Sequence, residues 1–279
     1  MNRKKQKSRI GRDWWKYLAA VFILIIYLLP VYVVVVMSLK PVTDHTSRLF
    51  LPAEVYLGNY LKVFKNSNML GAMKNSLIIT AGTVAIVVIA GCLAAYPMAR
   101  RKDRLGKAVK IFILGVMMVP GMSMVVGVYA TLVSIHAIST YRGIIFVSAA
   151  FGLPFSIYMY SNFIAAIPDT LDEAAAIDGA DVLTIFFKII LPQLKPVTAC
   201  VLLMQGVSTW NEYGYSLYVL QKPNMYNVTL TVKQFFGEQI KDLNGAAACA
   251  AVAIIPVVII YLFLQKYFVK GAIDSAVKG

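Results

Sequence analysis

Charged residues are scarce in this sequence, and acidic ones are the scarcest. Only 14% of the 279 residues are charged, and 13 Asp and Glu stand against 27 Lys and Arg. A soluble domain carries about 25% charged residues. Because 59% of the residues are hydrophobic, the composition excludes a soluble globular fold and indicates a membrane protein.

Cysteine and histidine are almost absent, with 3 and 2 residues. Cys92, Cys200 and Cys249 lie in apolar stretches, which favours packing over disulfides or metal ligation. His45 and His136 have no carboxylate or thiol at ligand spacing, so we expect no metal site. The sequence also lacks G-x4-G-K-[ST] and any paired catalytic groups. We therefore expect no catalytic residue and no ATP bound by this chain itself.

Long apolar runs take the place of the missing charge. A helix that crosses about 30 Å of hydrocarbon needs about 20 apolar residues. Six segments have that length, at residues 17–37, 76–98, 111–133, 144–166, 197–219 and 246–268. None of them alternates polar and apolar residues as a barrel strand does. The sequence therefore predicts an all-α membrane protein with six transmembrane helices.

Lys and Arg are distributed unevenly between the predicted loops. Seven lie in the arm 1–16 and six in the loop 100–110, whereas Arg142 is alone after the third run. Positively charged loops face the cytoplasm, which places both termini and the loop 167–196 on that side of the cell membrane. The first run is longer than a signal-peptide core and no cleavage site follows it, so we expect it to remain as a span. We expect lipid contact and no nucleic-acid partner.

The loop between the fourth and fifth runs carries the most detailed pattern. Thr170 and Glu173 have the spacing of a capping box, and Gly179 stands where a glycine ends a helix with left-handed backbone. Asp181 is expected to cap a second helix, whose apolar residues recur at helical spacing, and Pro192 to end it. We predict two short helices joined by a bend at Gly179.

Residues 173–192 have the spacing E-A-A-x3-G-x9-I-x-L-P. This spacing resembles the coupling loop of the membrane subunits of ABC importers, which docks on an ATPase. Further features are similar to the carbohydrate branch, close to the second permease of maltose-type systems: Leu51-Pro52, Asn59-Tyr60, Asn75-Ser76, Ala94-Ala95-Tyr96, Trp210-Asn211-Glu212-Tyr213 and Val277-Lys278-Gly279. The resemblance implies a type I ABC importer permease fold. It assigns ATPase coupling to Glu173, Ala174, Ala175, Asp178, Gly179, Ile189, Leu191 and Pro192.

The same resemblance implies partners rather than cofactors. We expect a second permease subunit in a heterodimer, two copies of an ABC ATPase that bind the ATP, and an extracytoplasmic solute-binding protein. The external loop 220–245 is expected to contact that binding protein through a turn at Lys222, Pro223 and Asn224.

The chain is expected to divide into a basic arm 1–16, a transmembrane domain 17–268 and a cytoplasmic tail 269–279. For the tail, two roles stay open. It either reaches between the ATPase subunits, as the resemblance implies, or anchors the chain to anionic lipid.

The sequence indicates substrate contacts less clearly than it indicates the coupling loop. Glu212 is the one acidic residue in a predicted span. With Asn211 and Tyr215 it either lines a sugar path or only bonds a neighbouring helix, and both interpretations stay open.

The expected function is the permease subunit of an ATP-driven sugar importer. Alternatives are an importer of a non-sugar solute, an ion-coupled secondary transporter, or a membrane enzyme. The second, third and fourth runs lack the Asp, Glu, Lys, Arg and His that ion coupling uses.

Overall fold

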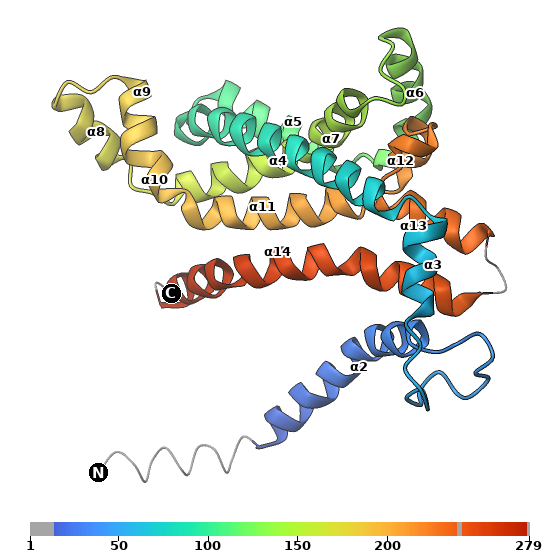
Figure 1. The fold of residues 1–279 in the computed structure, drawn as a ribbon. Coiled ribbons are helices and arrows are strands. Elements are labelled where there is room, and N and C mark those ends of the chain that lie inside the picture. Colours follow the sequence, from blue (N-terminus) through green and yellow to red (C-terminus); the bar gives the residue numbers. More distant parts are fainter. Residues whose placement is uncertain (1–13, 239–241, 278–279) are drawn as a thin grey trace, which may run out of the picture. The chain divides into compact units, whose positions relative to one another are not determined.

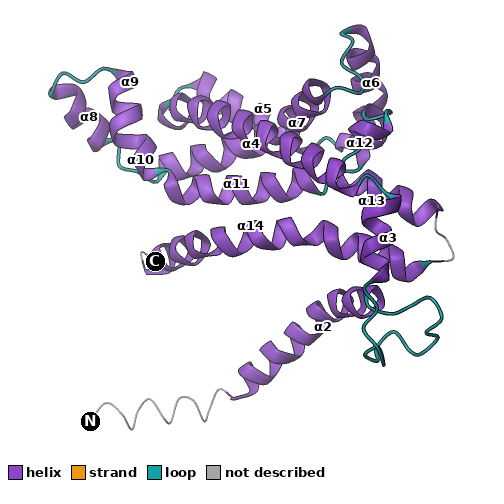
Figure 2. Cartoon of the chain, viewed as in Figure 1, coloured by secondary structure: helices purple, strands orange, loops and turns teal. Residues whose placement is uncertain are grey.

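The structure, a computed structural model, describes residues 14–238 and 242–277 (Figure 1). Every regular element within these ranges is a helix (Figure 2). A helix satisfies its own backbone hydrogen bonds, as a chain in hydrocarbon requires. The predicted all-α membrane class is confirmed. Most of the basic arm and the last two residues of the Val277-Lys278-Gly279 ending lie outside the described residues.

Four helices are long and apolar enough to cross a membrane: α2 (Trp14–Ser38), α4 (Met69–Arg100), α7 (Tyr141–Ala165) and the segment Leu243–Phe263 of α14 (Leu243–Val277). Two bent helix pairs raise the number of candidate spans to as many as six. The first, second, fourth and sixth predicted runs thus lie on unbroken helices. The third and fifth do not.

The third predicted run, 111–133, is broken near its middle. Helix α5 (Arg104–Met118) stops, and η1 (Gly121–Met124) with α6 (Val125–Ser134) continues at 86° to it. Pro120 lacks the amide that a helix needs, and Val119 before it is extended, with φ −75° and ψ 122°. The expectation of one continuous helix here is wrong, because Pro120 breaks it.

The fifth predicted run, 197–219, is also interrupted. Helix α11 (Lys195–Trp210) ends before Asn211, and α12 (Gly214–Val219) starts afresh. The Glu212 carboxylate accepts hydrogen bonds from the amides of Tyr215 at 2.6 Å and Ser216 at 2.9 Å. These amides have no carbonyl partner at a new helix start, so the side chain stabilises a second helix in place of one long one.

The chain divides into two compact units. The first contains Met1–Ser67 and Gln234–Val252, with α2 and α3 (Gly58–Asn66). Asn59 donates from its amide to the carbonyls of Ser38 at 2.9 Å and Lys40 at 2.8 Å. These bonds tie α3 to the end of α2, most of whose residues are exposed.

The second unit contains Asn68–Lys233 and Ala253–Gly279, and its core is the packing of α4 against α7. Gly91 lies against Ser156, whose hydroxyl donates to the Val87 carbonyl at 3.0 Å. Gly82 lies against Ile145, so the two helices run parallel. A side chain at Gly91 would meet that of Ser156, which is why this close approach requires glycine.

Helices also occupy segments predicted as loop or tail. Helix α13 (Val228–Glu238) and η3 (Pro223–Met225) fill much of the predicted external loop 220–245, of which 239–241 lie outside the described residues. Helix α14 continues through Val277. The predicted tail 269–279 is thus helical as far as it is described, and its two proposed roles stay predictions.

Candidate functional site: the loop between α7 and α11

The loop 167–196 forms two helical segments that bend at Gly179, as predicted. The first is α8 (Thr170–Ile177). The second is continuous through α9 (Val182–Thr184), the π-helix η2 (Ile185–Ile190) and α10 (Leu191–Gln193). Figure 1 shows α8 and α9 together at one end of the second unit, with α10 leading to α11. The second segment meets α11 at 72°.

Gly179 ends α8 in the conformation that the spacing predicts. Its φ is +84°, a region that residues with a side chain rarely adopt. The Gly179 amide donates to the Ala176 carbonyl at 3.1 Å, and the Ala180 amide to the Ala175 carbonyl at 2.9 Å. This pair of bonds is a Schellman motif, which satisfies the last carbonyls of a helix. The bend is therefore fixed by backbone geometry.

The start of α8 differs from the prediction. Asp169, not Thr170, occupies the N-cap position, its backbone is helical, and no side chain caps the first amides. The predicted capping box of Thr170 and Glu173 is therefore wrong. Arg100, the last residue of α4, instead binds two acidic residues of this turn, Asp169 and Asp172.

Arg100 holds α8 through charge-assisted hydrogen bonds. Its Nε and Nη2 each donate to a different carboxylate oxygen of Asp172, both at 2.9 Å. Its Nη1 donates to Asp169 at 2.8 Å. The Arg100 and Asp172 side chains are only 15% and 17% exposed. Paired, planar bonds of this kind are the strong ones among side-chain contacts, so α8 is fixed to the end of α4.

Two carboxylates of the loop are held in their charged form. A hydrogen bond from Lys102 at 2.5 Å lowers the pKa of Asp169, and the charge of Arg100 adds to this effect. Hydrogen bonds from Thr184 lower the pKa of Asp181. The contribution of both groups is therefore present at neutral pH and is lost only as the pH falls through their lowered pKa values.

The second helical segment starts and packs as predicted. Asp181 caps it by accepting from the Thr184 amide at 2.9 Å. Ile185, Phe186 and Ile190 are buried in the core cluster of the second unit. The apolar stripe therefore holds this segment against the unit's own helices, although Val182 at its start is exposed.

Pro192 does not end this segment. The Leu191 amide donates to the carbonyl of Phe186, five residues earlier, which is the π-helical pattern. Pro192 lies within α10, and the direction changes only after it, where Leu194 joins α10 to α11. Its expected role as a terminator is corrected.

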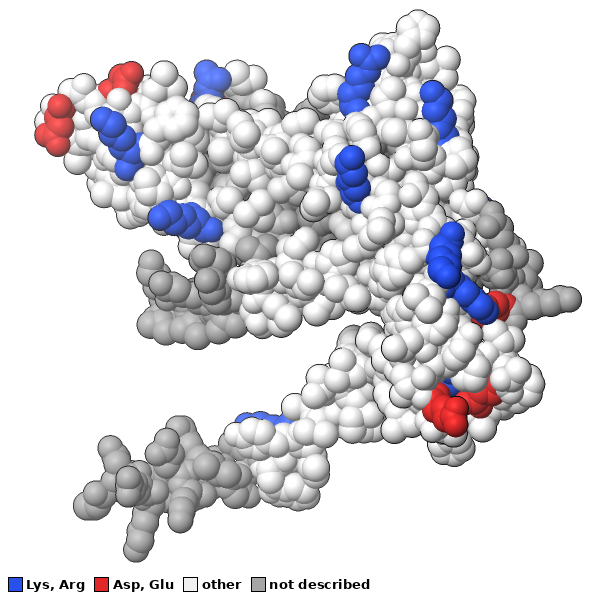
Figure 3. All heavy atoms as spheres, in the orientation of Figure 1, with Lys and Arg blue, Asp and Glu red and all other residues white. Residues whose placement is uncertain are grey.

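The residues assigned to ATPase coupling fall into two groups. Glu173, Ala174, Asp178, Gly179 and Pro192 are exposed. Ile189 and Leu191 are partly buried against the core. Ala175 is only 9% exposed and belongs to the core cluster, so it packs α8 onto its own chain. Figure 3 shows side chains of both charge signs around this end of the second unit.

A polar cavity of about 530 Å³ lies where α11 ends. Its lining brings together Asn211, Glu212 and Tyr215, the three residues predicted for the substrate path. Tyr215 stacks on Phe151 with ring centroids 4.9 Å apart. The buried Ser148 hydroxyl at its wall has no hydrogen-bond partner among the described residues. The cavity thus combines an aromatic pair with one unpartnered hydroxyl.

Glu212 itself is a structural residue in this arrangement. Besides the two amides of α12, the Ser216 hydroxyl donates to its carboxylate. The Glu212 carbonyl accepts from Asn227 at 2.8 Å and from Thr229 at 2.7 Å. The Glu212 carboxylate therefore bonds the neighbouring helix α12, as one of the two interpretations predicted. Its place in the cavity wall keeps the substrate-path interpretation open.

The turn predicted to contact a binding protein is exposed. Lys222, Pro223 and Asn224 all lie on the surface, the last two within η3. Asn75 of α4 donates from its amide to the carbonyls of Asn224 and Tyr226, both at 2.9 Å. The Asn75-Ser76 pair thus acts as the support of this turn, a role that its position in the sequence did not reveal.

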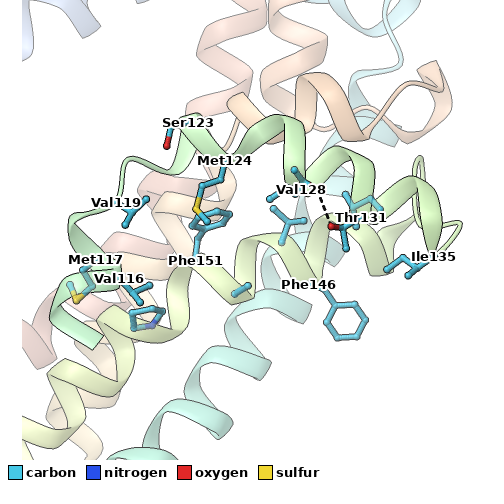
Figure 4. Close-up of a pocket in the computed structure, with 15 residues that line it drawn as sticks. Val116, Met117, Val119, Ser123, Met124, Val128, Thr131, Ile135, Phe146 and Phe151 are labelled. Atoms are coloured by element: carbon cyan, nitrogen blue, oxygen red, sulfur yellow. Dashed lines mark hydrogen bonds between the residues drawn. The ribbon is translucent and has the colours of Figure 1, made fainter. Parts of the chain in front are cut away.

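A second cavity has a different character. It measures about 940 Å³ and lies between α5, η1, α6 and α7 (Figure 4). Its lining is mostly apolar, and Ser123 and Thr131 are the hydroxyl residues that line it. The Thr131 hydroxyl already donates to the Gly127 carbonyl at 2.9 Å. This lining offers little to a polar solute.

Comparison with known proteins finds transport permeases that are similar to this chain along nearly its whole length. The melibiose/raffinose/stachyose import permease MelC of Bacillus subtilis is 36% identical over 263 residues, covering 94% of this chain and 95% of its own. The multiple sugar-binding transport system permease MsmG of Streptococcus mutans is 31% identical over 280 residues, covering 98% and 100%.

A solved structure shares the fold. It is a chain of a bacterial ABC transporter involved in the import of the acidic polysaccharide alginate, with a TM-score of 0.78 at 22% identity over 94% of this chain and 98% of that one. Residues 87–274 match the family described as binding-protein-dependent transport system inner membrane component. That segment includes both the loop 167–196 and the polar cavity. The chain therefore belongs to this family of multi-pass membrane components of binding-protein-dependent transport systems.

Proposed function

We propose that this chain is a permease subunit of an ATP-driven importer that carries a sugar or oligosaccharide. The observation that carries the proposal is the 36% identity to a melibiose, raffinose and stachyose import permease over 94% of the chain. The polar cavity beside the stacked Phe151 and Tyr215 rings supports a solute of this kind.

The loop 167–196 is the proposed coupling element. Its exposed residues Glu173, Ala174 and Asp178 dock on an ATPase that holds the ATP, while Ala175, Ile189 and Leu191 keep the loop packed on the permease. The support for this division is their burial. A rigid loop transmits a displacement of its outer face to the helices on which it packs, whereas a flexible loop deforms instead.

The remaining assembly follows the family pattern. We place a second permease subunit beside this chain in a heterodimer, two ATPase copies in the cytoplasm and a solute-binding protein outside. Both termini and the loop 167–196 then face the cytoplasm, in agreement with the positive-inside distribution of Lys and Arg. The turn at Lys222, Pro223 and Asn224 is the proposed contact for the binding protein.

Reconstitution tests the function. The chain is purified with the permease, ATPase and binding protein encoded beside it and placed in lipid vesicles. We expect ATP-dependent uptake of radiolabelled raffinose or stachyose, and ATP hydrolysis stimulated by the loaded binding protein. Uptake of an amino-acid mixture in place of sugars would transfer the assignment to a non-sugar solute. Sugar uptake driven by a proton gradient without ATP would overturn the importer assignment.

A further inference from the structure

Arg100 joins three helix ends in the second unit. It is itself the last residue of α4, and its bonds to Asp169 and Asp172 reach the first turn of α8. Its Nη1 also donates to the carbonyls of Ile164 at 3.2 Å and Ile167 at 2.9 Å. Ile164 lies in the last turn of α7. One guanidinium therefore connects α4, α7 and the proposed coupling helix.

The charges at this junction favour a cation in this position. The carbonyl end of a helix carries partial negative charge, and the Ile164 carbonyl at the end of α7 accepts from Arg100. The carboxylates of Asp169 and Asp172 accept from it as well. Arginine presents its donors in a rigid planar fork, which serves several acceptors at once, whereas lysine offers one point charge. The contacts thus use the geometry of arginine as well as its charge.

Tyr96 extends the junction to the second half of the loop. One turn before Arg100 on α4, its hydroxyl donates to Asp172 at 2.8 Å. Its ring lies 5.3 Å, centroid to centroid, from that of Phe186 in the π-helix. The end of α4 therefore contacts both helical segments of the loop, one on each side of the Gly179 bend.

We propose that Arg100 is a positioning residue for energy coupling, which fixes the coupling helix α8 to the ends of α4 and α7 so that movement of the ATPase reaches the transport bundle. This inference rests on the proposed function and adds to it the contacts through which movement of the ATPase reaches the transport helices. The positive charge of Arg100 alone, as one of six basic residues in the segment 100–110, would only set orientation.

The neighbouring residue supplies a matched control. Arg101 has the same charge and the same position in the topology, but its side chain is 58% exposed, and its ion pair is with Asp103 at 3.5 Å and not with Asp169 or Asp172. Arg100→Gln and Arg101→Gln therefore remove the same charge from the same loop. They differ in whether the contact to α8 is lost.

The test uses the assembled complex in lipid vesicles, with Arg100→Gln, Arg100→Lys, Asp172→Asn and Arg101→Gln compared at equal membrane levels. We expect sugar uptake per ATP hydrolysed to fall about tenfold in Arg100→Gln and Asp172→Asn, a size typical of coupling between sites. Basal ATP hydrolysis is expected to persist. Arg100→Lys should recover part of the ratio, and Arg101→Gln should match the wild type.

Hydrogen exchange of the peptide 168–178 provides a readout that does not depend on transport. Its amides should exchange faster in Arg100→Gln than in Arg101→Gln. Equal exchange in the two variants, or an unchanged ratio of uptake to hydrolysis in Arg100→Gln, would overturn the inference. A parallel loss of uptake and basal hydrolysis would also overturn it, since it would indicate a merely structural role. If the wild-type complex showed no ATP-driven uptake, the proposed function would fail, whatever the exchange data said of Arg100.

Discussion

At the scale of single residues, Gly179 shows a constraint that comes from the backbone alone. A Cβ at this position would meet nothing within 4 Å, so there is room for a side chain. The φ of +84° is nevertheless unfavourable for any residue with a Cβ, by about 1–2 kcal/mol. The cost of substitution therefore measures the bend itself and not lost packing.

We expect Gly179→Val to leave the chain inserted in the membrane but to lower sugar-stimulated ATP hydrolysis and uptake, because a β-branched residue opposes this backbone. Gly179→Asn should be milder, since asparagine tolerates left-handed backbone. Membrane level, uptake and hydrolysis are measured together. Gly115→Ala is the control, as it adds a Cβ into open space without a positive φ. Wild-type stimulation and uptake in Gly179→Val would contradict the prediction.

Glu212 shows how an acidic residue near a substrate path can owe its place to local structure. Its two carboxylate oxygens accept from two amides and a hydroxyl at the start of α12. Glutamine keeps the shape but offers one acceptor oxygen and turns an N–H toward a donor. An unsatisfied buried donor costs about 1–3 kcal/mol.

Glu212→Gln is therefore expected to lower the thermal stability of the purified complex. Asn211→Ala, next to it in the cavity wall, should leave stability unchanged and alter the concentration dependence of uptake. Thermal unfolding followed by fluorescence gives the first quantity, and vesicle uptake gives the second. A stable Glu212→Gln complex with selectively lost uptake would instead identify Glu212 as a substrate ligand.

At the scale of elements, the second half of the loop places two neighbouring phenylalanines in opposite environments. Phe186 is buried in the core cluster, whereas Phe187 is exposed. Their rings touch edge to face at 5.0 Å. Truncation of a buried phenylalanine to alanine costs about 3–5 kcal/mol, and an exposed one has little packing to lose.

Phe186→Ala should accordingly loosen the segment 182–193, with faster hydrogen exchange there and reduced uptake. Phe187→Ala is the matched control for the segment's own packing and should leave exchange unchanged. If Phe187 contacts the ATPase, its loss weakens assembly of the complex, which size-exclusion chromatography detects. Equal exchange in both variants would show that burial of Phe186 does not hold the segment.

At the scale of the whole molecule, the proposed mechanism depends on which side of the membrane each loop faces. Ile177 is 86% exposed at the end of α8, and Lys222 is exposed at the turn before η3. They are expected on opposite sides, Ile177 inside and Lys222 outside. These two positions report orientation directly, because neither packs against its own chain.

We expect an impermeant maleimide to label Lys222→Cys in intact cells, and Ile177→Cys only after permeabilisation, in a chain whose three cysteines are replaced. The same Ile177→Cys should crosslink to a cysteine-bearing ATPase in the complex. Ala175→Cys should not, because that side chain is buried against the core. Labelling of Ile177→Cys from outside would invalidate the proposed coupling role of the loop.

The helix class, the bend at Gly179 and the Asp181 cap were readable from the sequence, because each follows from local rules. Hydrophobic length sets the spans, a glycine permits positive φ, and a short acidic side chain caps a helix three residues on. Two local rules misled the prediction. The run 111–133 was expected to form one transmembrane helix, which breaks at Pro120, and Thr170 with Glu173 was expected to form a capping box.

The contacts between distant residues were decided only by the tertiary structure. The sequence presents Arg100 as one basic residue among six and Asp172 as a carboxylate near a helix start. Only the parallel packing of α4 and α7 brings residues 72 positions apart into a paired contact at 2.9 Å. Ala175, assigned to ATPase coupling from the resemblance, likewise lies in the core cluster of its own chain. Local rules act over a few residues, whereas which side chain meets which across the bundle is determined by how whole helices pack.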